Sequence, residues 1–321
     1  MIEPKFRGIG RFSEGLCAVS IDQKWGYIDA QGEIVIPPRF DQAGVFSEGL
    51  SRVLIDRTFF YIRRDGSDPF GTTFGNARPF LDGFARVMVD GHWGWINRSG
   101  TVVIPPTYKA THGFANGLAA VKKDNTWGYI DRRGKVVIAF AFDDARSFQN
   151  GFAAVNIDGK WGMVDPKGKV VVRPEYGFLG NVNEGLVCAV KDGKCGFLTP
   201  TGKVVIEPQF ESARDFREGL AAVRIGTQED GNWGYISREG EFAIEPQFER
   251  AGFYSDGLAL VRKRNGLWGF INKTGRFVIE PEFPKANAFW DGLAEVTLGT
   301  GVDYWTTYIR KDGTYLWRPK R

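Results

Sequence analysis

Short runs of β-forming residues alternate with turn residues along this chain, and one stretch shows the pattern clearly. Residues 84–89 alternate loosely between apolar and polar side chains, and Asp90 and Gly91 follow them. Asp-Gly closes two-residue hairpins because both residues tolerate a positive φ. Residues 93–97 and 101–104 then predict a second and a third strand, and two prolines end the third because proline cannot donate a ladder hydrogen bond. The pattern predicts a three-stranded antiparallel meander.

The same phrase returns nine times, each time marked by a glycine before Leu or Phe. The marker glycines are Gly15, Gly49, Gly83, Gly117, Gly151, Gly185, Gly219, Gly257 and Gly292. The first seven are 34 residues apart, and the last two gaps are 38 and 35 residues. A fixed period of this size is typical of a repeat array. We therefore expect an all-β protein in which residues 1–321 form a single array of nine meander repeats. The array is either an open superhelix (solenoid) or a propeller-like ring.

Irregular copies refine this expectation. All changes in length fall between the first and second strands, where a hairpin tip tolerates insertion. The link before each copy, such as the one spanning Phe40, Ala43 and Phe46, leaves room for a short fourth strand. The second copy is degenerate, since it loses its third-strand pattern around residues 67–71, which indicates either a bend or a specialised surface. The ninth copy, marked by Gly292, is expected to be a terminal cap.

Several elements of the repeat keep their spacing across copies. The first copy contains Glu14-Gly15-Leu16, the stretch at residues 24–29, Gly32 and the stretch at residues 35–40. Trp-Gly itself occurs at Trp25, Trp93, Trp127, Trp161, Trp233 and Trp268. With these elements the chain resembles the WG-repeat (KWG-repeat) family of mostly bacterial proteins. The resemblance implies an all-β repeat fold and an interaction role, and it implies no shared catalytic residues.

Composition limits the classes of partner. Lys and Arg total 42 against 38 Asp and Glu, so the net charge is only +4 and no basic tail indicates nucleic acid. Cys17, Cys188 and Cys195 are too few for a disulfide framework, and we interpret them as small buried hydrophobic residues. No apolar run approaches the length of a membrane span, and the amino terminus lacks the apolar segment of a signal peptide. We expect a cytoplasmic protein.

Residue types with catalytic or ligand-binding potential have ordinary structural explanations. The acidic residues before the marker glycines, such as Glu14 and Glu48, are expected to bond their own turn backbone rather than calcium. The repeated Trp is expected to fill the gap between stacked units. His92 and His112 have no second ligand at metal spacing. We therefore predict no catalytic residues, no cofactor and no metal site.

The favoured hypothesis is a non-enzymatic scaffold that binds a protein or an extended polymer. Loops that break a repeat tend to carry specificity, so the longer tips of copies seven and nine are candidates. The predicted interaction residues are Gln228, Glu229, Asp230, Tyr304 and Trp305. The first alternative is nucleic-acid or polyanion binding through aligned basic pairs such as Arg63-Arg64. The second is carbohydrate binding through exposed Trp.

Overall fold

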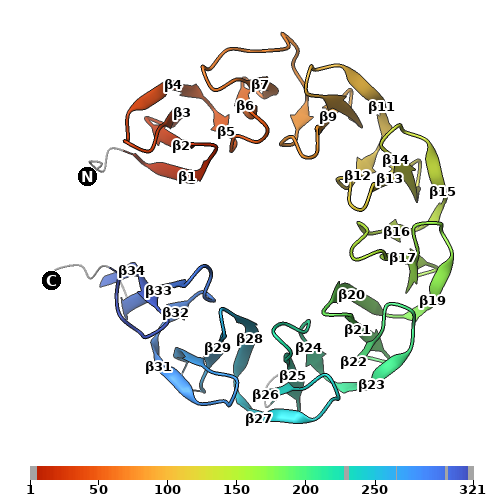
Figure 1. Cartoon of the computed structure of the whole chain (residues 1–321), viewed down its shortest axis with the longest axis vertical. Coiled ribbons are helices and arrows are strands. Elements are labelled where there is room, and N and C mark those ends of the chain that lie inside the picture. Colours follow the sequence, from red (N-terminus) through yellow and green to blue (C-terminus); the bar gives the residue numbers. More distant parts are fainter. Residues whose placement is uncertain (1–5, 228–230, 265, 301–302, 317–321) are drawn as a thin grey trace. The chain divides into compact units, whose positions relative to one another are not determined.

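The computed structural model describes residues 6–227, 231–264, 266–300 and 303–316, and within them the protein is built from β-strands. The strands form nine small antiparallel sheets, one for each predicted copy. We call each sheet a blade and number the blades along the chain (Figure 1). The chain divides into two compact units, Met1–Ser147 and Phe148–Arg321. Blades one to four belong to the first unit, blades six to nine to the second, and blade five begins at the boundary.

In the first unit, each blade is a meander whose strands follow the chain order. Blade one comprises β1 (Gly8–Ser13), β2 (Leu16–Ile21), β3 (Lys24–Ile28) and β4 (Ile34–Phe40), and blade two comprises β5 (Gln42–Ala43), β6 (Ser51–Ile55) and β7 (Thr58–Ile62). Blade three comprises β8 (Asn76–Ala77), β9 (Phe84–Val89), β10 (His92–Asn97) and β11 (Val102–Tyr108). Blade four comprises β12 (Ala110–Thr111), β13 (Leu118–Lys123), β14 (Thr126–Asp131) and β15 (Val136–Phe142).

The remaining blades repeat this plan. Blade five comprises β16 (Asp144–Ala145), β17 (Ala153–Ile157), β18 (Lys160–Val164) and β19 (Val170–Tyr176), and blade six comprises β20 (Phe178–Asn183), β21 (Leu186–Lys191), β22 (Lys194–Leu198) and β23 (Val204–Phe210). Blade seven comprises β24 (Ser212–Ala213), β25 (Ala221–Ile225), β26 (Asn232–Ile236) and β27 (Phe242–Phe248). Blade eight comprises β28 (Arg250–Ser255), β29 (Leu258–Arg262), β30 (Trp268–Ile271) and β31 (Phe277–Phe283), and blade nine comprises β32 (Lys285–Ala286), β33 (Leu293–Thr300) and β34 (Asp303–Arg310).

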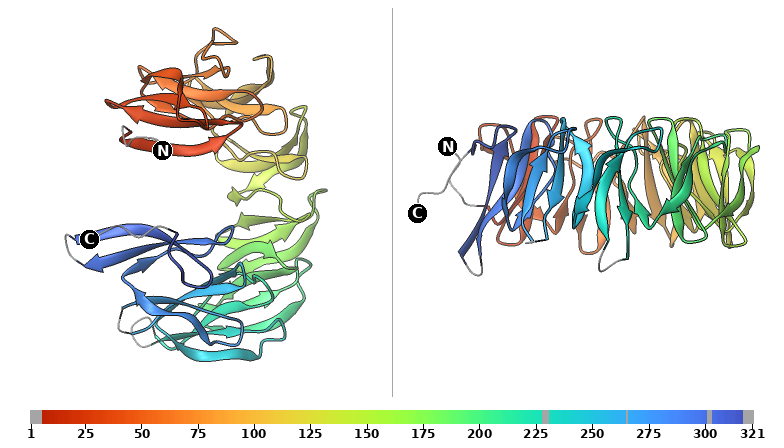
Figure 2. Two further views of the ribbon diagram at one scale, coloured as in Figure 1. Left: turned by 60° about the vertical axis from the view of Figure 1, so that its left-hand side comes forward. Right: turned by 90° about the horizontal axis from the view of Figure 1, so that it is seen from below.

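The predicted meander and the short fourth strand are confirmed. The extra strand comes first in each blade, and in most blades it is only two residues long, as in β5 and β12. Within each unit, successive blades stand side by side with their turns at the same two edges (Figure 2). The turns form for the reasons expected: Asp90 and Gly91 have φ values of 48° and 77°, and Gly100 donates to the carbonyl of Asn97 at 2.9 Å.

The glycine of Trp-Gly lies where the last strand crosses close to the one before it. The ladder register shifts across this glycine, between Trp93 and Trp95, where β10 pairs with β11. A Cβ atom on Gly94 would lie 2.5 Å from the Ile104 carbonyl oxygen and 2.6 Å from the Pro106 nitrogen. Only glycine fits this approach, because both neighbours are backbone atoms.

The residue two positions after the repeated Trp fills the space between blades. Trp95 is 1% exposed and Tyr61 is completely buried. Six of the rings at this position meet a ring from the link of the next blade, with centroids 4.7–5.3 Å apart. The pairs are Tyr27–Phe46, Tyr61–Phe80, Trp95–Phe114, Phe197–Phe216, Tyr235–Tyr254 and Phe270–Phe289.

The predicted burial of the repeated Trp needs correction. Trp127 is 8% exposed, but Trp25, Trp93 and Trp161 are only half-buried. The Trp lies next to the hairpin turn, where the neighbouring blade covers it less completely than the aromatic ring two residues further on. Several of these Trp rings are instead covered by a cation, as Trp93 is by the guanidinium of Arg78 at 5.7 Å.

The second blade lacks its last strand, the one that the sequence analysis found degenerate around residues 67–71. Its sheet contains β5, β6 and β7. In place of the missing strand, a loop brings Phe70 and Phe74 to Tyr61, with ring centroids 5.8 Å and 6.1 Å away. A short bridge pairs Phe74 with Phe59. The core of this blade is therefore completed by aromatic side chains from an irregular segment. Within the described part of the chain, no helix has the length and hydropathy needed to cross a bilayer.

Candidate functional site

The tips predicted to carry function are only partly placed. Gln228, Glu229 and Asp230 lie outside the described residues. Tyr304 and Trp305 lie on β34, where Trp305 pairs with Leu298 of β33. The Trp305 side chain is half-buried, and its Nε1 is buried with no hydrogen-bond partner among the described residues. Their joint role as an interaction surface stays a prediction.

The histidines and cysteines have structural surroundings. His92 contacts the Asp90 carbonyl through Nδ1 at 2.9 Å, and His112 stacks on Trp127 with ring centroids 5.2 Å apart. Partial burial lowers the pKa of His112, and the charge of Arg86 lowers it further. The three cysteines are free and buried, which confirms their interpretation as buried residues. The described residues contain no group of three or more His, Cys, Asp and Glu side chains able to hold a metal.

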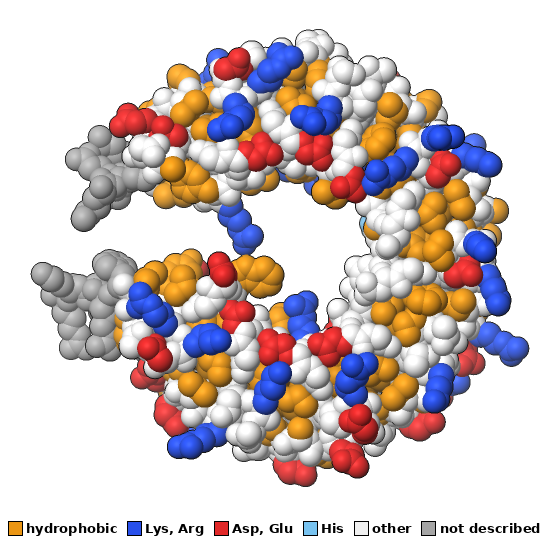
Figure 3. Space-filling model, viewed as in Figure 1, with side chains coloured by type: hydrophobic (Ala, Val, Ile, Leu, Met, Phe, Trp, Pro, Cys, Tyr) orange, Lys and Arg blue, Asp and Glu red, His pale blue; other side chains and the backbone are white. Residues whose placement is uncertain are grey.

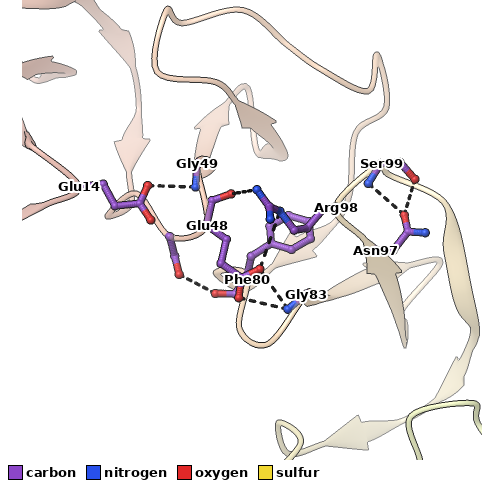
Figure 4. Close-up of polar contacts among 9 residues, drawn as sticks. Glu14, Glu48, Gly49, Phe80, Gly83, Asn97, Arg98 and Ser99 are labelled. Carbon is purple, nitrogen blue, oxygen red and sulfur yellow. Dashed lines mark hydrogen bonds and ion pairs between the residues drawn. The ribbon is translucent and has the colours of Figure 1, made fainter.

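The acidic residue before each marker glycine has a role that the sequence analysis missed. Glu14 and Glu48 do occupy turns, with φ values of 52° and 56°. Their carboxylates, however, accept the N–H of the marker glycine in the next blade: Gly49 donates to Glu14 at 3.0 Å and Gly83 to Glu48 at 3.0 Å (Figure 4). The same bond recurs from Gly219 to Glu184, from Gly257 to Glu218 and from Gly292 to Asp256. The expected bond to its own turn is thus replaced by a bond between blades.

A basic residue 50 or more positions later completes this brace. Arg98 donates to the Glu48 carbonyl at 3.0 Å (Figure 4), and Arg132 pairs with the Asp82 carboxylate at 2.8 Å. This pairing of an acid with a basic residue 50 positions later can be found in the sequence once the structure has shown which two positions meet. Where the acid becomes Asn116 or Asn150, the residue 50 positions on is not basic but Pro166 or Pro200. We call this acid–glycine–base contact the inter-blade brace.

The brace leads to a stability prediction. We expect Glu48→Ala to lower the free energy of unfolding by about 1.5–3 kcal/mol, because the N–H of Gly83 loses a charged acceptor. Asp291→Ala is the matched control, since Asp291 holds the same position in blade nine and its carboxylate accepts no glycine N–H among the described residues. Urea denaturation of both variants measures the difference. Equal effects of the two substitutions would contradict the brace.

Two pockets lie in the first unit, and the brace borders one of them. That pocket, of about 470 Å³, is formed mainly by charged residues around Glu48 and Arg98, whose charges already satisfy each other. The other, of about 360 Å³, is formed by the links that precede β6, β9 and β13. Its lining includes Phe46, Arg78, Leu81, Phe84, Arg86 and Trp95. We call this second pocket the arginine–aromatic pocket.

Positive charge in and beside this pocket has no carboxylate partner. Arg52, Arg78 and Arg86 form no ion pair among the described residues. Arg52 donates to the Ala77 carbonyl at 3.1 Å and Arg86 to the Thr111 carbonyl at 2.7 Å. Burial lowers the pKa of Arg52 and Arg86, and the like charge of Arg78 lowers it further. Arginine nevertheless stays protonated. The three guanidinium groups therefore lie close enough to repel one another, and a bound anion would offset that repulsion.

Two of these arginines depart from the repeat, and this departure was the signal that the sequence offered. Arg52 and Arg86 occupy a position of the first long strand that holds alanine in four other copies (Ala18, Ala120, Ala154 and Ala222) and arginine in no other copy. Arg78 occupies a link position that is glycine in four other copies, such as Gly44 and Gly252, but arginine in two, at Arg146 and Arg214. The pair Arg52 and Arg86 is therefore specific to copies two and three, whereas an arginine at the position of Arg78 is not.

A comparison with protein-family models decides the family. The model described as WG containing repeat matches residues 1–25, 25–58, 93–127, 127–161, 161–195, 196–226, 233–267 and 268–299. The chain belongs to the WG-repeat family. Residues 59–92 of this WG-repeat protein lie outside the matched segments, and they contain Arg78, Leu81, Phe84 and Arg86. The arginine–aromatic pocket thus takes six of its thirteen lining residues, Arg78 and Arg86 among them, from this unmatched segment.

Solved structures with the same kind of fold are propeller-like. A eukaryotic initiation factor resembles this WG-repeat protein with a TM-score of 0.55 and 10% identity, over 95% of this chain and 96% of that one. BamB from Moraxella catarrhalis has a TM-score of 0.42 and 10% identity, over 95% and 94% of the two chains. AztD from Citrobacter koseri has a TM-score of 0.41 and 12% identity, over 96% and 92%. No curated protein matches this chain in sequence.

Proposed function

We propose that this WG-repeat protein is a non-enzymatic interaction protein that binds an acidic peptide segment of a protein partner in the arginine–aromatic pocket. The proposal rests on one observation: Arg78, Arg86 and the adjacent Arg52 lie together and have no carboxylate partner among the described residues. A glutamate or aspartate of the partner would pair with the guanidinium of Arg78, which is exposed. The half-buried Arg86 lines the same pocket and would add positive charge next to that pair.

Apolar side chains around the cations favour a peptide over a free anion. Leu81 is 63% exposed and Val45 is 39% exposed at the pocket, and Phe84 and Phe114 are partly buried in its wall. A large hydrophobic residue next to the acidic one would cover these groups. Arginine and aromatic residues together are enriched at protein interfaces.

The lining also favours binding over catalysis. None of the residues that line the pocket is a histidine, a cysteine or a carboxylate. Its two serines, Ser13 and Ser47, donate to the backbone carbonyls of Phe46 and Phe80 at 2.6 Å and 2.7 Å. A nucleophile needs an adjacent general base, and neither serine has one in this lining.

Nucleic acid is the other class of anion to consider, and the distribution of charge argues against it. Lysine and arginine side chains alternate with aspartate and glutamate over the face seen in Figure 3. Binding to a phosphate backbone needs a track of many cations. Three clustered arginines in an otherwise balanced surface fit one or two carboxylates better.

Panning a random peptide library on the full chain tests the proposal. We expect the selected peptides to share a glutamate or aspartate next to a large hydrophobic residue. Arg78→Gln should weaken their binding roughly tenfold or more, because a hydrogen bond to a charged group contributes about 1.5–3 kcal/mol. Arg133→Gln is the matched control, since Arg133 is an exposed arginine outside the pocket. Fluorescence anisotropy with a labelled selected peptide measures the affinities.

Two results would overturn the proposal. One is a set of selected peptides without acidic residues, or with an affinity that Arg78→Gln leaves unchanged. The other is tight binding of a labelled DNA duplex, with a Kd below about 1 μM at physiological salt, that Arg78→Gln abolishes; this would favour the polyanion alternative.

A further inference from the structure

Blade six carries cysteine at two positions of the repeat where the other copies have none. Cys195 holds the position of the repeated Trp, as Trp127 does in blade four. Cys188 holds the position of the first long strand that is alanine in four other copies, such as Ala120. Cys17 lies at a different position, two residues after its marker glycine. Two of the three cysteines of the chain therefore fall in one hairpin, and both depart from the repeat.

The ladder of this hairpin places the two thiols on the same face of the sheet. β21 and β22 pair Cys188 with Phe197 and Val190 with Cys195. Residues two positions apart on a strand point to the same face, so Cys188 and Cys195 are diagonal neighbours across the two strands. The right-handed twist of paired strands shortens this diagonal. Both side chains are buried, at 6% and 7% exposure, in one cluster with Phe197 and Phe210.

The surroundings of the two thiols make them differ in acidity. A hydrogen bond from the Cys188 thiol is the main cause that lowers the pKa of Cys195, and burial opposes it. The backbone N–H of Ala213 and the charge of Arg224 lower the same pKa further. The hydrogen bond to Cys195 and burial both raise the pKa of Cys188. Because the thiolate is the reactive form of cysteine, Cys195 is the nucleophile of the pair and Cys188 is the thiol next to it.

We infer that Cys188 and Cys195 are a redox-active dithiol, which a small hydroperoxide oxidises to a disulfide and a small dithiol reduces again. The burial of both side chains selects for an oxidant of this size, and Cys195 lies two residues after the turn glycine Gly193, at the edge of the blade. The inference concerns blade six alone, and it does not depend on what the arginine–aromatic pocket binds.

The oxidation takes two steps. In the first, the thiolate of Cys195 attacks the O–O bond of the hydroperoxide; one oxygen remains on Sγ as a sulfenic acid, and the other leaves as hydroxide or alkoxide and takes up a proton. In the second, Sγ of Cys188 attacks Sγ of Cys195, so that the S–S bond forms and the S–O bond breaks. The hydroxyl group leaves as water with the proton of Cys188. The two thiols thus lose the two electrons that reduce the hydroperoxide.

Treatment of the folded full chain with hydrogen peroxide tests this inference. Remaining thiols are then alkylated with N-ethylmaleimide in denaturant, and tryptic peptides are mapped by mass spectrometry without reduction. Trypsin separates the two cysteines because Lys191 and Lys194 lie between them. We expect the peptides of Cys188 and Cys195 to be joined by a disulfide that dithiothreitol reverses. Cys17 is the internal control: it is completely buried and has no second thiol beside it, so we expect it to be recovered as the alkylated thiol.

Two variants, with their folds verified by circular dichroism, test the roles of the thiols. In Cys188→Ser the reaction should stop at the sulfenic acid of Cys195, which dimedone traps, whereas in Cys195→Ser the thiol of Cys188 should not react. The inference is overturned if both cysteines of the wild type remain thiols while peroxide oxidises glutathione in the same solution. It is also overturned if the disulfide joins two chains or includes Cys17, or if dimedone labels Cys188 in Cys195→Ser as well as it labels Cys195 in Cys188→Ser. The disulfide map of the wild type decides the matter without the variants if either of them fails to fold.

Discussion

Gly94→Ala is expected to lower the free energy of unfolding by about 3 kcal/mol, a large effect for a single methyl group. The added Cβ would lie 2.5 Å from the Ile104 carbonyl oxygen and 2.6 Å from the Pro106 nitrogen. Both atoms belong to the backbone of β11, so relief requires β11 to move away from β10. Chemical denaturation followed by circular dichroism measures the loss.

Gly75→Ala in the link to the same blade is the matched control. A Cβ there would lie 3.7 Å from the Met88 carbonyl oxygen, which is ordinary contact. We expect this substitution to change stability by less than about 1 kcal/mol. If Gly94→Ala were as mild as Gly75→Ala, the close crossing of the last two strands would not explain the glycine of Trp-Gly.

Trp95→Ala is expected to cost about 3–5 kcal/mol, and Trp93→Ala clearly less. The two residues share a type and a strand, but Trp95 is 1% exposed and packs on Phe114, whereas Trp93 is half-buried beside the hairpin turn. The comparison separates the aromatic ring between blades from the Trp that defines the repeat. Thermal melts of both variants decide it, and a larger loss for Trp93→Ala would restore the original interpretation of the repeated Trp as the main core residue.

Local signals explain why so much of the fold was predictable. The strands and turns of a blade depend on neighbouring residues, such as the Asp90-Gly91 hairpin and the Asn97–Gly100 turn, and the fixed period reveals the copies. The burial of Trp93 was predicted wrongly because a residue that recurs in every copy has a constant environment, but the repetition does not say how deeply the side chain is buried. Burial depends on how far the next blade extends, and that is a property of packing between copies.

The site was less predictable for the same reason. The insertions around Gln228 and Trp305 drew attention because they change the length of the repeat. Arg52, Arg78 and Arg86 change no length, and they come together only when adjacent blades pack, since Arg52 lies on β6, Arg86 on β9 and Arg78 in the link before β9. The available signal was substitution within the register, with Arg52 and Arg86 where four other copies have alanine, together with the degenerate pattern of the second copy. The inter-blade brace was hidden similarly, because its partners lie 35 and 50 residues apart.

The central claim is that Arg78 in the arginine–aromatic pocket pairs with a carboxylate of a bound peptide. A double-mutant cycle tests it most directly, with anisotropy measured for a selected acidic peptide and its Glu→Gln or Asp→Asn counterpart against the wild type and Arg78→Gln. The account predicts that each change alone weakens binding roughly tenfold, and that the two together weaken it little more than either one, because both remove the same contact. Losses that simply multiply would contradict a direct pairing of the two groups.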